Sequence, residues 1–173
     1  GILARARRHG VPARAFGPSR FKTRLEPELE ADVARALQET GVELVVLAGY
    51  MRVVKSPLLE AFPGRIINVH PALLPSFPGL RAWEQAVRYG VKVSGCTVHF
   101  VDAGVDSGPI ILQRPVPVFD TDTPESLHRR IQDAEHELLP AAIQLFATGA
   151  LSLDGRLVRI RDEQAAASPA SFA

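Results

Sequence analysis

Residues 65–80 read RIINVHPALLPSFPGL, an apolar run that leads into a histidine and a proline-rich segment. The run Arg65–Val69 is short and rich in β-branched residues, which predicts a buried strand. The segment His70–Leu80 contains three prolines and a glycine, which predicts an ordered loop without regular secondary structure. A rigid loop placed directly after a strand shapes a pocket. The stretch therefore predicts a strand end that carries a binding site.

A second apolar run precedes the first one along the chain. Val42–Ala48 is interrupted only by Glu43 and is typical of a strand that is buried on both faces of a parallel sheet. Proline starts, glycine stops and apolar spacing predict the remaining elements. One predicted helix ends before Gly10, and the others run from Pro27 to Gly41, from Ser56 to about Phe62, from Ala82 to Tyr89 and from Thr123 onward, the last with a kink or break at Pro140. The predicted strands lie at residues 12–16, 91–101 and 110–112, and a hairpin turn is predicted at Asp154–Gly155.

The order of these elements indicates the fold class. Strands that alternate with helices predict an α/β fold with a mostly parallel, Rossmann-like sheet flanked by helices. In such folds ligands bind at the carboxyl ends of the strands. We therefore expect the functional site in the loops after Val69 and Val101 and at Met51–Arg52, which follows the strand Val42–Ala48.

Composition excludes several classes of protein. The chain has 173 residues, 46% of them hydrophobic and 23% charged, as in an ordinary single globular domain. No apolar run reaches the roughly 20 residues that span a bilayer. The net charge of +1 argues against a nucleic-acid or membrane-surface partner. The single cysteine, Cys96, and the lack of a recognisable secretory signal favour a reducing, cytoplasmic setting.

Asn68, His70 and Asp106 are the candidates for catalysis. Asn68 and His70 are two residues apart at the end of one predicted strand, so their side chains can share a face. Asp106 lies in the loop after the strand at residues 91–101. An amide donor, an imidazole and a carboxylate suit acyl transfer, because they can stabilise an oxyanion, carry a proton and tune its acidity. From the pattern alone, a structural role for Asn68 and His70 remains the alternative.

The other marked residues favour structural roles. His99 lies in an apolar strand, which is typical of a histidine in the core, and Trp83 is expected to cover the core. His128 and His136 are eight residues apart, too far for the i, i+4 spacing of a metal site. With one cysteine and no suitable pair of histidines, we expect no metal cofactor.

Several sequence blocks together resemble one enzyme family. Residues 68–80 are similar to the signature of phosphoribosylglycinamide formyltransferases, which transfer a formyl group in purine biosynthesis. Residues 47–52, 98–113 and 132–136 resemble further blocks of that family, in the same order. The resemblance runs from Gly1 to about Ile160 and implies a three-layer formyltransferase fold. It also implies a formyltransferase domain over residues 1–163. The small and polar residues 164–173 predict a disordered tail.

The resemblance also implies roles for individual residues. His70 would be the proton donor, Asn68 would contact the formyl group, and Asp106 would raise the pKa of His70. The implied substrates are 10-formyltetrahydrofolate as co-substrate and glycinamide ribonucleotide as acceptor, in a protein that is a monomer or a homodimer. The implied folate-binding residues are Arg24, Met51, Arg52, Val53, Val54, Asn68, Asp102, Ala103, Gly104 and Val105, and the implied ribonucleotide-binding residues are Gln132 and Glu135.

The resemblance leaves other functions open. Family members begin with a strand, a phosphate-binding loop, a helix and a second strand, whereas this chain begins at Gly1 in what reads as the end of a helix. We therefore expect an N-terminal portion to be missing. The alternatives are formyltetrahydrofolate deformylase, which shares the Asn, His and Asp, and an inactive folate-binding fragment. Methionyl-tRNA formyltransferase also shares these residues but has a C-terminal RNA-binding domain, for which this chain is too short and too neutral.

Overall fold

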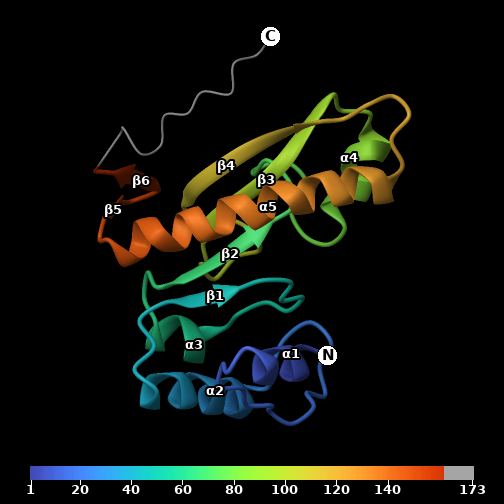
Figure 1. Cartoon of the computed structure of the whole chain (residues 1–173). Coiled ribbons are helices and arrows are strands. Elements are labelled where there is room, and N and C mark those ends of the chain that lie inside the picture. Colours follow the sequence, from blue (N-terminus) through green and yellow to red (C-terminus); the bar gives the residue numbers. More distant parts are fainter. Residues whose placement is uncertain (162–173) are drawn as a thin grey trace.

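The computed structural model describes residues 1–161, so the tail predicted at residues 164–173 lies outside the described residues. Figure 1 shows the helices and strands in sequence order. The helices are α1 (Ile2–Arg8), α2 (Pro27–Glu39), α3 (Ser56–Ala61), α4 (Ala82–Tyr89) and α5 (Pro124–Ala147). The strands are β1 (Val45–Leu47), β2 (Ile66–His70), β3 (Val93–Phe100), β4 (Ile110–Pro117), β5 (Leu151–Asp154) and β6 (Leu157–Ile160).

The main sheet has the strand order β1-β2-β3-β4, and β5 pairs with β6 in a separate hairpin. β1 and β2 are parallel, whereas β3 is antiparallel to both β2 and β4. The predicted α/β class with a mostly parallel sheet is confirmed, because β1, β2 and β4 run in the same direction and only β3 is reversed. The eight-residue helix α4 spans only about 12 Å, so the chain between β2 and β3 does not return along the sheet before it pairs.

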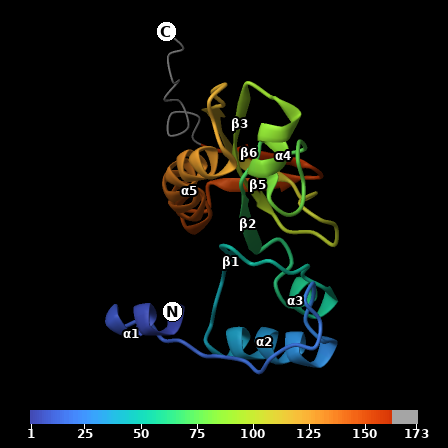
Figure 2. The ribbon, with the colours of Figure 1, turned by 90° about the vertical axis from the view of Figure 1, so that its right-hand side faces the viewer.

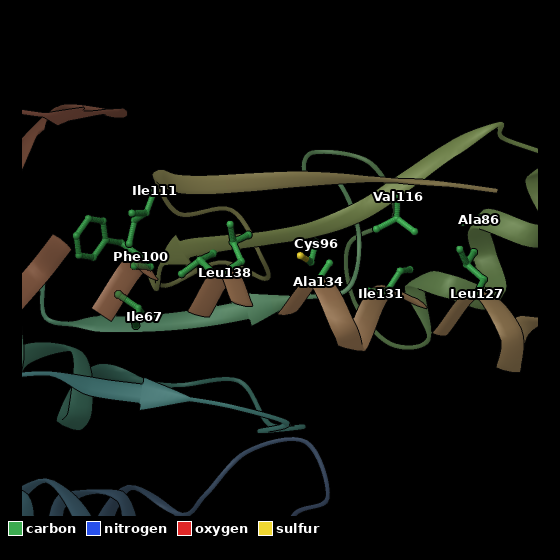
Figure 3. Packing of buried hydrophobic residues seen from close by; sticks show 12 residues of the cluster. Ile67, Ala86, Cys96, Phe100, Ile111, Val116, Leu127, Ile131, Ala134 and Leu138 are labelled. Carbon is green, nitrogen blue, oxygen red and sulfur yellow. The ribbon is translucent and has the colours of Figure 1, made fainter. Parts of the chain in front are cut away.

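Two apolar clusters lie on the sheet. The larger cluster joins β2, β3 and β4 to α5, whose residues Leu127, Ile131 and Leu138 are almost fully buried (Figure 3). Each such side chain contributes about 1.5–3 kcal/mol relative to exposure. The second cluster joins β1 to α2 and α3. Figure 2 shows α5 on one side of β2 and β3, and Figure 1 shows α2 and α3 beyond β1.

Several predicted elements need correction. Residues 12–16 form no strand, because this exposed segment has no neighbouring strand to pair with in the described chain. The strand predicted at Val42–Ala48 is shortened to β1, and α3 begins after Lys55 rather than after a Ser56 cap. β4 extends well beyond the residues 110–112 that were predicted.

Helix α5 runs without interruption through Pro140, so the predicted break is wrong. Proline deprives the carbonyl of residue 136, one turn earlier, of its hydrogen-bond donor. His136 and Pro140 are both exposed, so water can satisfy that carbonyl. Within residues 1–161, no helix is both long and apolar enough to cross a membrane.

Candidate active site

A cleft of about 580 Å³ opens at the carboxyl ends of β1 and β2. Its floor contains Asn68 and His70 from β2 and Asp106 from the loop between β3 and β4. One wall is the segment after β1, and the opposite wall comes from α4 and α5. The cleft therefore lies where the sequence places the ligand site.

Strand register brings the floor together. Asn68 lies opposite His99 on β3, and His70 lies opposite Thr97. Asn68 and His70 are two residues apart, so both side chains project from the same face of the sheet. The predicted convergence of Asn68, His70 and Asp106 is confirmed, since Asp106 reaches both His70 and His99.

His70 is 4% exposed and faces an acceptor at each ring nitrogen. Nδ1 lies 3.3 Å from Oδ2 of Asp106, and Nε2 lies 2.9 Å from the carbonyl oxygen of Phe77. A carbonyl only accepts, so Nε2 carries a hydrogen. Burial lowers the pKa of His70, while the Asp106 charge and the Phe77 carbonyl raise it, and the effect of burial is larger. Asp106 therefore raises the pKa of His70, as expected, but the pKa is lowered overall because burial has the larger effect.

Asp106 is held in a left-handed backbone conformation with φ of 49°. Such a conformation costs free energy in a residue other than glycine, and it recurs at functional sites. Oδ2 of Asp106 also accepts a hydrogen bond of 2.8 Å from the backbone N–H of Gly79. Burial would raise the pKa of Asp106, but His99, the Gly79 N–H and the charge of His70 together lower it. Asp106 is therefore ionised, and its Oδ2 faces Nδ1 of His70.

His99 connects Asn68 to this group. Its Nδ1 donates to the carbonyl oxygen of Phe100 over 2.8 Å, so a neutral ring has an unprotonated Nε2. That Nε2 lies 3.3 Å from Nδ2 of Asn68 and accepts one of its hydrogens. The second hydrogen of the amide is left for a ligand. The sequence-based interpretation of His99 as a core histidine was correct on burial but missed these contacts, which only the register reveals.

The walls contain most of the other predicted binding residues. The cleft is lined by Met51, Arg52, Val53, Val105, Gln132 and Glu135. A smaller pocket shares Arg52, Val53 and Val105 with the cleft and adds Val54, Asp102 and Gly104. Ala103 and Arg24 line neither cavity. Arg24 instead lies over the ring of Phe21, with 4.5 Å from its guanidinium carbon to the ring centroid.

Two features of the α4 and α5 wall were not predicted. Trp83 stacks on His128, with ring centroids 3.7 Å apart and planes 4° apart, and both rings line the cleft. Burial also raises the pKa of Glu135 to about 7, so this carboxyl changes charge near neutral pH. The spacing His128, Gln132, Glu135 places all three on one face of α5, and that periodicity is the signal that could have revealed the wall.

Known proteins share this arrangement. The sequence matches the family described as formyl transferase over residues 2–143. The chain belongs to the formyl transferase family. Glycinamide ribonucleotide transformylase 1 from Symbiobacterium toebii is 57% identical and superposes with a TM-score of 0.87, covering 92% of this formyl transferase and 74% of that chain. The resemblance to phosphoribosylglycinamide formyltransferases is thereby confirmed.

Other relatives differ from this chain in length and have different names. Phosphoribosylglycinamide formyltransferase from Bacillus subtilis is 43% identical over 83% of this chain and 72% of its own length. The human trifunctional purine biosynthetic protein adenosine-3 is 43% identical over 93% of this chain, which spans only 16% of that protein. A formyltetrahydrofolate deformylase from Pseudomonas syringae is 28% identical, with a TM-score of 0.86, over 93% of this chain and 53% of its own.

Proposed function

We propose that this formyl transferase moves the formyl group of 10-formyltetrahydrofolate to the amine of glycinamide ribonucleotide. The observation that carries the proposal is the joining of Asn68, His70 and Asp106 at the floor of one cleft. Relatives named for this reaction support the choice of substrates. We also propose that residues 1–163 are the formyltransferase domain, that the chain acts as a monomer or homodimer, and that it works in the cytoplasm.

The proposed chemistry is direct transfer. The amine nitrogen attacks the formyl carbon, the bond from that carbon to the folate nitrogen breaks, and a proton moves from the amine to the folate nitrogen. The formyl oxygen becomes an oxyanion in between. The second Nδ2 hydrogen of Asn68 is one donor for that oxyanion. The protonated ring of His70 becomes the other donor when its Nε2–H is released from the carbonyl of Phe77. Each donor stabilises the transition state more than the neutral formyl group.

The surroundings of His70 suit a proton donor. Burial lowers its pKa, so the imidazolium gives up its proton more readily than an exposed histidine. The acceptors at its two ring nitrogens stabilise the charged form once it has formed. Asp106, with its lowered pKa, stays ionised and supplies the compensating charge.

Binding roles follow from the two walls. We propose that the segment Met51–Val54, together with residues 102–105, holds the folate, because these residues line the cleft and the pocket next to it, apart from Ala103. Gln132 and Glu135 on the opposite wall would contact the ribonucleotide. The role proposed for Arg24 has weaker support, because its guanidinium lies over Phe21 rather than in the cleft.

An assay with and without the amine tests the function. The chain is incubated with 10-formyltetrahydrofolate, with and without glycinamide ribonucleotide, and formylated ribonucleotide and free formate are measured. The same assay is repeated with His70→Ala. We expect a formylated product that requires both the amine and His70. Formate release at the same rate without the amine would indicate a deformylase instead. Folate binding without either product would indicate a folate-binding protein.

A further inference from the structure

The proline-rich loop at residues 71–81 forms hydrogen bonds with the catalytic candidates through its backbone. The Phe77 carbonyl accepts from Nε2 of His70, and the Gly79 N–H donates to Oδ2 of Asp106. That Asp106 oxygen is the one that faces Nδ1 of His70. The path of this loop therefore sets one contact of the imidazole and one contact of the carboxylate at the same time.

The first part of the loop is fixed to β3 by a single hydroxyl. Thr97 is fully buried, and its Oγ1 donates to the carbonyl of Ala72 over 2.7 Å. The same oxygen accepts from the Leu74 N–H over 3.0 Å and from Nε2 of Gln113 over 3.0 Å. Nε2 of Gln113 also donates to the carbonyl of Leu74 over 2.9 Å. One hydroxyl and one amide thus satisfy three backbone groups of the loop.

The surface of β3 is shaped to accept this part of the loop. A Cβ at Gly95 would lie 2.8 Å from the Leu73 side chain and 2.1 Å from the carbonyl oxygen of Arg114. Ala72 is fully buried, and Leu74 is 5% exposed. Thr97 lies between His70 on β2 and Gln113 on β4 in the register, so the anchor is part of the same sheet as the catalytic floor.

We propose that Thr97 and Gln113 are positioning residues, which hold the loop so that Phe77 and Gly79 orient His70 and Asp106. The inference rests on the formyl transfer proposed above, to which it adds two residues that do not themselves line the cleft. Without the hydroxyl, the N–H of Leu74 and the carbonyl of Ala72 lose their partners in a buried site. The loop then has to move so that these two backbone groups can form hydrogen bonds with water, and this movement also displaces the backbone groups that contact His70 and Asp106.

The decisive variants are Thr97→Val and Thr97→Ser. Valine keeps the shape of threonine without its hydroxyl, whereas serine keeps the hydroxyl. A displacement near 1 Å costs about a hundredfold in rate, so Thr97→Val should lower kcat about 10- to 100-fold with little change in KM. Thr97→Ser should retain most of the activity. Gln113→Leu should lower kcat about fivefold, the factor that one net hydrogen bond provides.

Ser94→Ala is the matched control. Ser94 lies on the same strand and is equally buried, but its Oγ has no hydrogen-bond partner within the described chain. Its replacement should leave kcat unchanged. Should Thr97→Val fail to fold, Gln113→Leu keeps the test valid, because Gln113 is exposed and its loss should be tolerated by the fold.

A readout independent of turnover completes the test. The titration of the His70 ring is followed by NMR in the full chain, where Asp106 and His99 are the titratable groups that face it. Displacement of the loop exposes the ring, so its midpoint should rise toward the ordinary histidine value in Thr97→Val but not in Ser94→Ala. A folded Thr97→Val with unchanged kcat and unchanged His70 titration would overturn the proposal. Absence of turnover in the unaltered chain would count against formyl transfer, while the titration would still test the positioning role.

Discussion

The two loops that follow the parallel strands differ in how they are held. The loop after β2, residues 71–81, is tied to β3, β4 and α4 by side-chain hydrogen bonds from Thr97, Gln113 and Gln85. The loop after β1, residues 48–55, has one side-chain hydrogen bond of this kind, from the Lys55 N–H to the Glu30 carboxylate, and one backbone hydrogen bond, from the Val53 N–H to the Thr23 carbonyl. The first loop contacts His70 and Asp106 through its backbone, whereas the second lines the cleft with side chains such as Met51 and Arg52. Rigidity is therefore concentrated where the chemistry occurs.

The largest effect on activity is expected at His70, which contacts the firmly held loop after β2. His70→Ala should lower kcat by about 10²–10³, the usual cost of losing one donor to an oxyanion. KM should change little, because His70 is 4% exposed and contributes to the transition state more than to ground-state binding. Steady-state kinetics with both substrates measure this. Turnover like that of the unaltered protein would remove His70 from the mechanism.

A second substitution tests how closely the loop after β2, residues 71–81, packs on β3. Gly95→Ala places a Cβ 2.1 Å from the Arg114 carbonyl oxygen, so β4 or the loop has to move. Overpacking of this kind costs about 1–3 kcal/mol of unfolding free energy. Gly17→Ala is the control, because a Cβ at Gly17 meets nothing within 4 Å. Equal melting temperatures for the two variants would show that the loop is less tightly seated than the structure indicates.

The α5 wall gives a pH-dependent effect. The pKa of Glu135 is about 7 in the folded chain against an ordinary 4.5, because burial opposes its charge. Between these values the unfolded chain has lost a proton that the folded chain keeps, so stability falls as pH rises through this window. Glu135→Gln should remove that fall, which is worth about 3 kcal/mol. Urea unfolding at pH 5 and pH 8 measures it, with Asp133→Asn on the same helix as the charge control. An unchanged pH dependence in Glu135→Gln would contradict the raised pKa.

The smallest effect is expected in the loosely held loop. Met51 is 64% exposed, and its replacement by alanine should change stability by less than about 0.5 kcal/mol. KM for the folate should rise while kcat stays close to that of the unaltered protein. A large fall in kcat would mean that the two loops do not divide their roles in this way.

Sequence reasoning predicted the helices well but the sheet only in part. Proline at the first turn of α2 and α5 and glycine after α4 are local signals, so these helices could be placed from the residues alone. The antiparallel direction of β3 depends on how far α4 carries the chain, which no local pattern encodes. The tolerance of Pro140 likewise depends on which side of α5 faces water.

The candidate site was likewise predictable from the sequence only in part. Asn68, His70 and Asp106 could be found because strand ends and loop composition are readable from the sequence. The apolar strand around His99 predicts a core histidine, because the sequence of one strand says nothing about the residue opposite it. The net lowering of the His70 pKa could not be foreseen either, since it depends on burial produced by the loop above the ring.

The register between β2 and β3 has a consequence for how this sequence can vary. Asn68 lies opposite His99, and His70 lies opposite Thr97, so the contact between Asn68 and His99 and the loop anchor lie two positions apart in one ladder, with the pair Val69 and Val98 between them. A shift of the register by a single residue moves every side chain of the shifted strand to the opposite face of the sheet. One inserted or deleted residue within β3 would thus separate His99 from Asn68 and Thr97 from the loop in one event. We therefore expect insertions and deletions to be tolerated in the turns but not within β2 and β3, where they would take the candidate site apart.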